Sequence, residues 1–216
     1  MKPILITVFA LTFSLLAHSQ ERVKVKISTK YGDMVAELYN ETPIHRDNFI
    51  KLVKEGFYDG TLFHRVIPGF MIQGGDPASK DDAPNTIIGN GGPGYTLPAE
   101  FNPQFFHKKG ALAAARMGDA VNLKKESSGS QFYIVEGQVY DNNTIDLFAK
   151  RMGVEFSSSQ KKAYTTVGGT PHLDSNYTVF GELVEGLEII SKISNVTRDK
   201  NNLPKDKVIM NISIVK

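Results

Sequence analysis

The chain contains no cysteine and no tryptophan among its 216 residues. The absence of cysteine excludes disulfides, thiol nucleophiles, thiolate metal sites and a lipid-modified cysteine at the N-terminal leader. Without disulfides, the folded chain must rely on its own hydrophobic core, and a chain of this length is ample for that. Runs of five or six like charges are also absent, and the net charge is only +2. We therefore expect no nucleic-acid partner, because such a partner requires a clustered basic face.

Long apolar runs are missing except at the N-terminus. Residues 4–17 are almost wholly apolar, follow the positive start at Lys2, and precede the small residues of Ala17-His18-Ser19. These three parts are typical of a secretory signal peptide, and the apolar run is short for a membrane span. We expect residues 1–19 to be a signal peptide, with an uncleaved anchor as the alternative. Residues 20–216 are then exported, to a periplasm or beyond it, without stable membrane association once the leader is removed.

The remainder of the chain reads as one mainly β domain. Residues 23–27 alternate apolar and charged side chains, which is the period of a half-buried strand. Further apolar stretches predict strands at 34–38, 110–115, 131–135, 177–180 and 208–215. A helix is predicted from Pro43, with Thr42 as its cap and Gly56 as its stop, and a second over residues 187–193. No repeat or linker divides the chain, so a closed barrel, which leaves no exposed edge, is the simplest expectation.

One segment interrupts this pattern of strands. Between about residues 140 and 168, the apolar side chains keep helical spacing, with charged residues between them, at Ile145, Phe148, Ala149 and Met152. The segment predicts an inserted amphipathic helix. We expect the insertion to be a solvated decoration packed against the barrel, since surface insertions are well tolerated. The alternative is that it provides an added surface for client or partner proteins.

The most informative run extends from Phe63 to Asp76 and reads FHRVIPGFMIQGGD. It mixes charge, apolar surface and an amide within nine residues, at Arg65, Phe70, Met71 and Gln73. On a strand–turn–strand path these side chains would line a shallow pocket with an apolar floor and a polar wall. From spacing alone, an ordinary barrel core with Arg65 at its edge fits equally well.

This run resembles the signature of the cyclophilin-type peptidyl-prolyl cis-trans isomerases. The similarity continues through 89–92 (GNGG), 113–116 (AAAR), 128–134 (SGSQFYI) and 173–181, and it covers the chain from Val23 onward apart from the insertion. The resemblance implies a closed antiparallel eight-stranded barrel capped by two helices. It also implies an isomerase that acts on proline-containing polypeptides, as a monomer and without a cofactor or metal.

The resemblance also assigns roles to individual residues. Arg65 matches the catalytic arginine, and Gln73 matches the polar neighbour that orients it. The walls around the substrate proline ring match Phe70, Met71, Tyr133 and Leu173. Further substrate contacts match Ala115 and Arg116, through their backbone, and Gln131 and Tyr177.

Two positions depart from the pattern. Tyr177 stands where many members have histidine, and His172 where tryptophan is common in eukaryotic members. The second departure predicts weak binding of cyclosporin with an intact proline pocket.

Other readings remain at this stage. A proline-binding or chaperone module, whose partner surface is the inserted helix, is the alternative function. A hydrolase is more distant, because no nucleophile motif or triad can be assembled. The histidines after the leader lack metal-site spacing, and His64 is expected to be structural.

Overall fold

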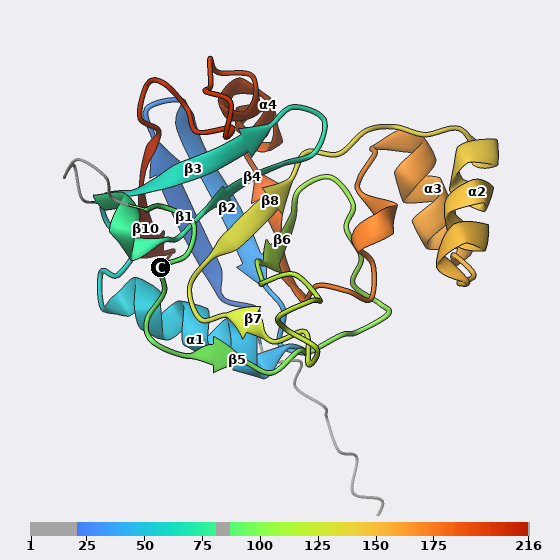
Figure 1. Cartoon of the computed structure of the whole chain (residues 1–216), viewed down its shortest axis with the longest axis horizontal. Coiled ribbons are helices and arrows are strands. Elements are labelled where there is room, and N and C mark those ends of the chain that lie inside the picture. Colours follow the sequence, from blue (N-terminus) through green and yellow to red (C-terminus); the bar gives the residue numbers. More distant parts are fainter. Residues whose placement is uncertain (1–20, 81–86, 216) are drawn as a thin grey trace, which may run out of the picture.

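Eight strands close into an antiparallel barrel in the computed structural model, which describes residues 21–80 and 87–215 (Figure 1). The predicted signal peptide lies outside the described residues. In order around the barrel, the strands are β1 (Lys24–Thr29), β10 (Ile209–Ile214), β3 (Thr61–Ile67), β4 (Met71–Gly74), β8 (Phe132–Val135), β6 (Ala111–Ala114), β9 (Val179–Glu185) and β2 (Gly32–Leu38). The short strands β5 (Thr96–Leu97) and β7 (Ser127–Ser128) form a separate pair. The predicted barrel is confirmed.

The strands differ in how many of their faces are covered. β1 and β2 alternate buried and partly exposed residues, as their sequence predicts, with Val25, Ile27 and Met34 inside the barrel. By contrast, β6 and β8 are buried along their whole length. Their inward side chains join the barrel core, and their outward side chains form a second apolar cluster with Leu173 and Val179. This second cluster forms the base of the candidate site.

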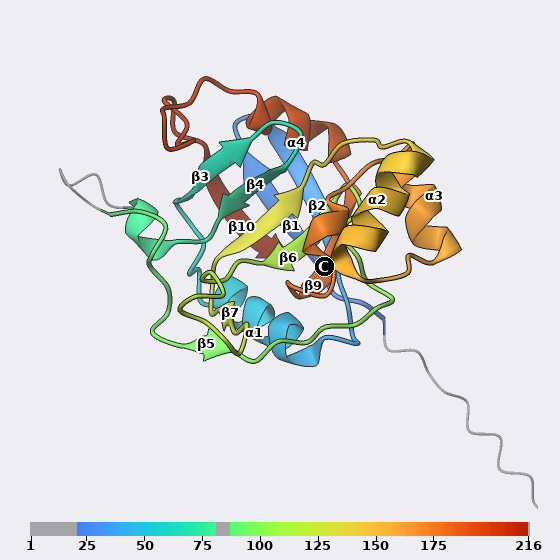
Figure 2. The ribbon, with the colours of Figure 1, turned by 45° about the vertical axis from the view of Figure 1, so that its right-hand side comes forward.

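Two helices cover the open ends of the barrel. Figures 1 and 2 show α1 (Pro43–Lys54) across one end and α4 (Leu187–Ser194) at the other. Thr42 is the N-cap residue of α1, as predicted, but its side chain makes no capping hydrogen bond. Instead, the backbone N–H groups of Ile44 and His45 donate to the Glu100 carboxylate at 3.0 and 2.8 Å. A distant loop therefore supplies the cap.

Two helices, rather than the single one expected, occupy the insertion. The first, α2 (Asn142–Met152), ends at Gly153, whose φ of 66° places it in the left-handed region that stops a helix. The second, α3 (Ser158–Thr166), begins with a capping box between Ser157 and Gln160. The two helices share a small apolar cluster, which includes the buried residues Ile145, Phe156 and Tyr164. We call residues 140–168 the inserted hairpin.

Glycines join the inserted hairpin to the barrel. Gly169 forms isolated bridges with Lys108 and Gln138, and a Cβ at this position would lie 2.3 Å from the His107 carbonyl oxygen. A Cβ on Gly137, whose φ is +66°, would meet the Gly169 Cα at the same short distance of 2.3 Å. Since real Cβ atoms do not approach so closely, only glycines allow the segments at the base of the hairpin to pack this tightly.

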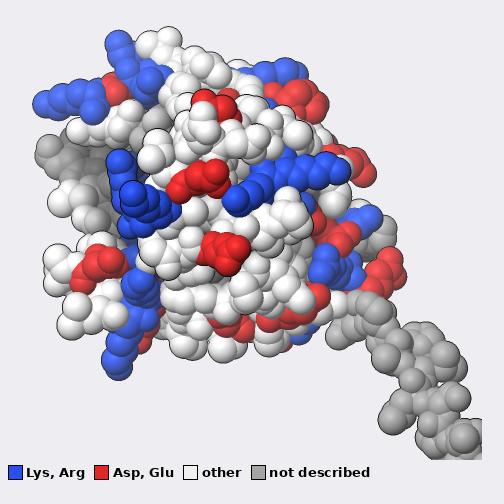
Figure 3. Space-filling view, turned by 90° about the vertical axis from the view of Figure 1, so that its right-hand side faces the viewer, with Lys and Arg blue, Asp and Glu red and all other residues white. Residues whose placement is uncertain are grey.

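Charges of both signs are interspersed on the face that carries the inserted hairpin (Figure 3). No continuous basic surface is visible there. No helix within the described part of the chain combines the length and the apolar character needed to cross a membrane.

His64, on β3, is buried, and neither of its ring nitrogens has a hydrogen-bond partner among the described residues. Burial lowers the pKa of His64, against a smaller opposing effect of Asp76. The unfolded chain then binds this proton more tightly than the folded protein. We expect the free energy of unfolding to fall as the pH drops through about 6.5, by at most ~1.4 kcal/mol per pH unit from this group.

Urea unfolding of the wild type and of His64→Leu, near pH 7.5 and near pH 5.5, measures this effect. Leucine removes the contribution of His64, so the loss of stability between the two pH values is expected to be smaller in the variant. An identical loss in both proteins would contradict the assignment.

Candidate active site

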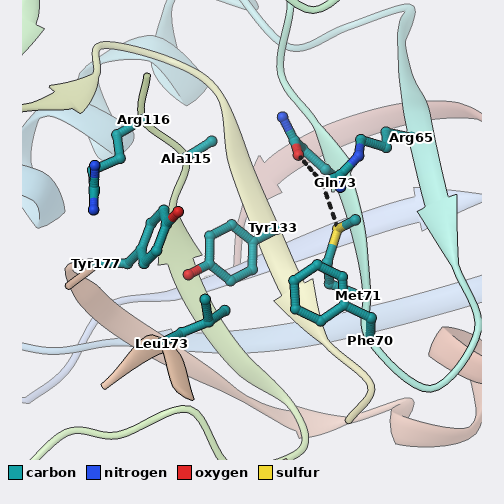
Figure 4. A pocket seen from close by; sticks show the side chains of 9 residues that line it. All are labelled: Arg65, Phe70, Met71, Gln73, Ala115, Arg116, Tyr133, Leu173 and Tyr177. Carbon is teal, nitrogen blue, oxygen red and sulfur yellow. Dashed lines mark hydrogen bonds between the residues drawn. The ribbon is translucent and has the colours of Figure 1, made fainter. Parts of the chain in front are cut away.

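Nine of the ten site residues predicted from the sequence surround one pocket on the outer face of the barrel. The pocket has a volume of about 110 Å³ and is lined by Arg65, Phe70, Met71, Gln73, Ala115, Arg116, Tyr133, Leu173 and Tyr177. Figure 4 shows Arg65 and Gln73 at one end and Arg116 and Tyr177 at the other, with Tyr133 between them. Pockets for whole drug-sized ligands measure roughly 300–1,000 Å³. This pocket therefore suits one small ring of a larger ligand.

The pairing of β3 with β4 places the polar end of the pocket. Arg65 on β3 lies opposite Gln73 on β4, next to a register irregularity that follows Phe63. The Arg65 Nη1 atom donates to Gln73 Oε1 at 3.2 Å and lies 3.9 Å from the Met71 sulfur. Burial lowers the pKa of the Arg65 guanidinium from its usual value, with Tyr177 acting weakly in the opposite direction. An arginine remains charged in proteins, so it presents a fixed cation at the edge of an apolar pocket.

A chain of hydrogen bonds holds Gln73 in this orientation. Gln73 Nε2 donates to Gln131 Oε1 at 3.1 Å, and Gln131 Nε2 donates to the carbonyl oxygens of Gly89 and Gly91 at 3.0 and 2.8 Å. Gln131 is buried and is the one predicted site residue that does not line the pocket. Its position supports Gln73 from behind.

Asp76 anchors the far end of this chain. Its carboxylate is fully buried and accepts the backbone N–H groups of Gly89 and Gly91 at 2.5 and 3.0 Å. A Cβ on Gly91 would lie 2.1 Å from Asp76 Oδ1. Glycine is thus required where the loop folds over the carboxylate. Asp76 closes the motif that was read from the sequence, but the sequence did not reveal that its side chain binds this loop.

The floor of the pocket is apolar. Met71 and Tyr133 are buried neighbours on β4 and β8, and Leu173 approaches them from the short helix η2 (Pro171–Leu173). Tyr177 packs edge to face on Tyr133, with ring centroids 5.9 Å apart. Phe70 closes the side of the pocket near Arg65, whose guanidinium carbon lies 5.9 Å from the Phe70 ring centroid.

The backbone groups that follow β6 bear on the prediction that Ala115 and Arg116 bind the substrate through their backbone. The N–H of Ala115 donates to the Gln131 carbonyl, and the Ala115 carbonyl accepts from the N–H of Ser128. Ala115 therefore contributes to the pocket wall through its side chain. The backbone N–H and carbonyl of Arg116 have no hydrogen-bond partner within residues 21–80 and 87–215. The Arg116 guanidinium instead lies over the Tyr177 ring, 4.5 Å from its centroid.

Behind the floor, the Tyr133 hydroxyl enters a buried polar relay that the sequence did not predict. His107 Nε2 lies 2.9 Å from the Tyr133 hydroxyl, and His107 Nδ1 lies 2.9 Å from Asp174 Oδ1. Since a carboxylate only accepts hydrogen bonds, Nδ1 donates to Asp174, and in a neutral imidazole Nε2 is then the acceptor for the tyrosine hydroxyl. The sequence offered His107 and Asp174 without any spacing that joins them, so only the fold brings them together.

A second histidine occupies a serine–histidine–glutamate arrangement. His45 Nε2 lies 2.9 Å from Ser127 Oγ, and His45 Nδ1 lies 2.6 Å from Glu100 Oε2. Ser127 and His45 are both only 2% exposed, so no substrate carbonyl can reach the hydroxyl. Burial alone would raise the pKa of Glu100, but hydrogen bonds from His45 and Ile44 hold it below its usual value. The geometry supports helix capping rather than a hydrolase.

Another pocket lies on the other side of Arg65. It measures about 390 Å³ and shares Arg65 and Gln73 with the first; its other lining residues are His64, Ile87, Ile88, Gly89, Asp199, Asn201 and Leu203. A ligand that fills the first pocket can therefore continue past the guanidinium into the second. No group of three or more metal-ligating side chains occurs within the described ranges.

Comparison with known proteins agrees with this geometry. Residues 24–215 match the family model described as cyclophilin type peptidyl-prolyl cis-trans isomerase/CLD. A putative peptidyl-prolyl cis-trans isomerase of Staphylococcus haemolyticus is 34% identical over 87% of this chain and 88% of its own length. A putative bifunctional phosphatase/peptidyl-prolyl cis-trans isomerase of Streptococcus pyogenes is 37% identical, but this chain spans only 37% of its length.

The solved structures include a cyclophilin type peptidyl-prolyl cis-trans isomerase of Cryptosporidium parvum. It matches with a TM-score of 0.64 and 28% identity, over 90% of this chain and 98% of its own. A second crystal structure of that protein, obtained in the presence of the dipeptide Ala-Pro, matches with a TM-score of 0.63. With the family model spanning nearly all of the described chain, this protein belongs to the cyclophilin-type peptidyl-prolyl cis-trans isomerases.

Proposed function

We propose that the pocket binds the proline ring of a polypeptide, and that Arg65 accelerates rotation about the preceding peptide bond. The observation that carries this proposal is the fixed Arg65 guanidinium at the rim of an apolar pocket sized for one small ring. The related Cryptosporidium parvum structure obtained in the presence of Ala-Pro supports proline as the ligand.

The reaction requires no proton transfer and no covalent intermediate. Rotation about an amide breaks its resonance, at a cost of about 18–20 kcal/mol. The cis form of an X-Pro bond lies only about 0.5–1 kcal/mol above the trans form, so the barrier rather than the equilibrium limits exchange. The enzyme must therefore bind the twisted amide more tightly than either planar form.

Arg65 supplies a donor for the twisted state. As the amide twists, the lone pair of the prolyl nitrogen leaves conjugation and becomes a hydrogen-bond acceptor. Gln73 already holds the guanidinium, so little reorganisation is needed when this acceptor appears. One preorganised donor contributes about 2.7–4 kcal/mol to a transition state, whereas a 10⁵-fold acceleration requires roughly 7 kcal/mol. The apolar floor supplies the remainder by excluding water, which disfavours the more polar planar amide relative to the twisted one.

Different parts of the protein surface would bind the substrate residues before and after the proline. The backbone of Arg116, which has no partner among the described residues, suits the residues before the proline. The larger pocket that shares Arg65 offers room for another part of the polypeptide. This arrangement suits an extended segment rather than a compact small molecule.

Replacement of Arg65 tests the mechanism directly. In a cis-to-trans relaxation assay on a proline tetrapeptide, with residues 20–216, Arg65→Ala is expected to lower kcat/KM by about 10²–10³-fold. Arg65→Lys keeps the charge but loses the planar fork of donors, so most of the loss should persist. Arg151→Ala, which removes an exposed arginine of α2, should retain wild-type activity.

An Arg65→Ala protein with wild-type activity would refute the role of the guanidinium. A folded wild type without activity would leave a proline-binding module, with the inserted hairpin as its partner surface, as the remaining hypothesis.

His172 generates a prediction about inhibition. It is exposed beside Leu173 and stacks on Phe70, with ring centroids 5.7 Å apart. The imidazole of His172 offers less apolar surface than the indole ring of a tryptophan, so cyclosporin should inhibit weakly. His172→Trp is expected to strengthen inhibition in the tetrapeptide assay, while nanomolar inhibition of the wild type would contradict the prediction.

The location of the substrates follows from the leader. We propose that residues 1–19 direct export and are removed, and that the mature monomer acts on polypeptides folding in a periplasm or outside the cell. Support comes from the apolar run followed by Ala17-His18-Ser19. Cell fractionation and N-terminal sequencing of the full chain test this; a mature protein that begins at Gln20 agrees, and an intact cytoplasmic protein does not.

A further inference from the structure

The inserted hairpin reaches the pocket through two separate contacts. The Tyr164 hydroxyl, on α3, donates to Asp174 Oδ2 at 2.6 Å, and Gln160 Nε2 donates to the same oxygen at 3.1 Å. On α2, the Phe148 ring stacks on His172, with centroids 6.2 Å apart, and His172 stacks in turn on Phe70. One contact leads to the floor of the pocket and the other to its side.

We propose that the inserted hairpin is a positioning element of the proline pocket, in which Tyr164 fixes Tyr133 through Asp174 and His107. The inference rests on the proposed function only in that the pocket is taken to bind proline. It gives the hairpin a role in the known reaction that neither a solvated decoration nor a partner surface requires.

The contacts of Asp174 show why the hairpin matters. Asp174 Oδ1 accepts the backbone N–H and the Nδ1–H of His107, both at 2.9 Å, while Oδ2 accepts the two donors from α3. The carboxylate is buried, so water cannot replace a donor that is lost, and Oδ2 would be left unsatisfied if both donors from α3 were removed. Both hydrogen bonds to Oδ2 come from the hairpin. Without them, the side-chain carboxylate of Asp174 is held only at Oδ1, by the backbone N–H and the ring of His107, among the described residues.

The orientation of Asp174 is transmitted to the pocket through His107. The carboxylate accepts from Nδ1, and in the neutral imidazole this leaves Nε2 as the acceptor for the Tyr133 hydroxyl. His107 is fully buried and stacks on Tyr133, with ring planes 13° apart. A rotated Asp174 would therefore allow His107 and the Tyr133 ring to tilt together. Because Tyr133 forms the floor, its tilt changes the fit of the proline ring in every state of the reaction.

The decisive variant is Tyr164→Phe, which removes one hydroxyl and keeps the ring packed against Phe106 and Phe156. We expect kcat/KM for a proline tetrapeptide to fall by about three- to tenfold, the scale of one buried hydrogen bond. The loss should lie in KM more than in kcat, because Tyr133 contacts the proline in ground and transition states alike. NMR exchange spectroscopy at increasing peptide concentrations separates the two constants.

A structural readout separates positioning from general damage. In the wild type, the buried Tyr133 hydroxyl proton should exchange slowly with water, and in Tyr164→Phe it should exchange faster while near-ultraviolet circular dichroism is unchanged. Tyr140→Phe is the matched control, since Tyr140 also belongs to the hairpin and its hydroxyl has no hydrogen-bond partner within the described ranges. This control should keep wild-type KM and Tyr133 signals.

The aromatic contact has its own pair of variants. Phe148→Leu removes the stack on His172 and should raise KM, as Tyr164→Phe does. Leu147→Ala, at the neighbouring side chain, which is 64% exposed, should leave KM unchanged. If Tyr164→Phe does not fold, Gln160→Met removes the second donor to Asp174 and should raise KM by a smaller factor; Ser157→Ala, which breaks only the capping box with Gln160, is its control and should keep wild-type KM.

Two results would overturn the inference. One is a folded Tyr164→Phe, or a folded Gln160→Met in its place, with wild-type KM and unchanged Tyr133 exchange. The other is an equal loss in the Tyr140→Phe control. An inactive wild type would instead refute the proposed function, and the exchange of the Tyr133 hydroxyl would still decide whether the hairpin holds the relay.

Discussion

The antiparallel register between β3 and β4 is the constraint on which the site depends. It sets Arg65 on β3 opposite Gln73 on β4. β4, which also carries Met71, pairs in turn with β8, where Tyr133 lies opposite Gln73. These four side chains, which differ in chemistry, thus share one face of the sheet. A shift by one residue would turn each of them toward the barrel core, since side chains alternate along a strand. The catalytic geometry is therefore a property of the barrel rather than of a loop.

Buried polar groups orient the side chains on this face of the sheet. Asp76 gathers the glycine loop, the loop carbonyls hold Gln131, and Gln131 orients Gln73. Asp174 plays the corresponding part beneath Tyr133. Each carboxylate is enclosed and surrounded by donors, which is the condition under which buried charge is tolerated. One network ends at Gln73 and the other at Tyr133, and both of these side chains line the pocket.

The sequence predicted the parts of this arrangement that depend on local pattern. Alternation identified β1, the capping residues placed α1, and ordered motifs assigned Arg65 and its neighbours. Contacts between distant segments could not be read in this way. Glu100 caps α1 by binding His45, which lies 55 residues earlier in the chain, and Tyr164 on α3 donates to Asp174 on the far side of the short helix η2. The helical period read from the sequence, from Ile145 to Met152, lies wholly within α2, so α3 was not predicted as a second helix.

The two ends of the inserted hairpin meet at Gly169, whose backbone N–H and carbonyl bond to Gln138. The chain thus leaves and re-enters the barrel at nearly one point. For such an excursion the entropy of loop closure grows only slowly with length, by about 0.6 kcal/mol for each doubling. Relatives can therefore lengthen or shorten the hairpin without disturbing the strand register. Such variation is free at the outer turn, near Gly153, and is limited near Tyr164, where a change in length would rotate α3 away from the barrel.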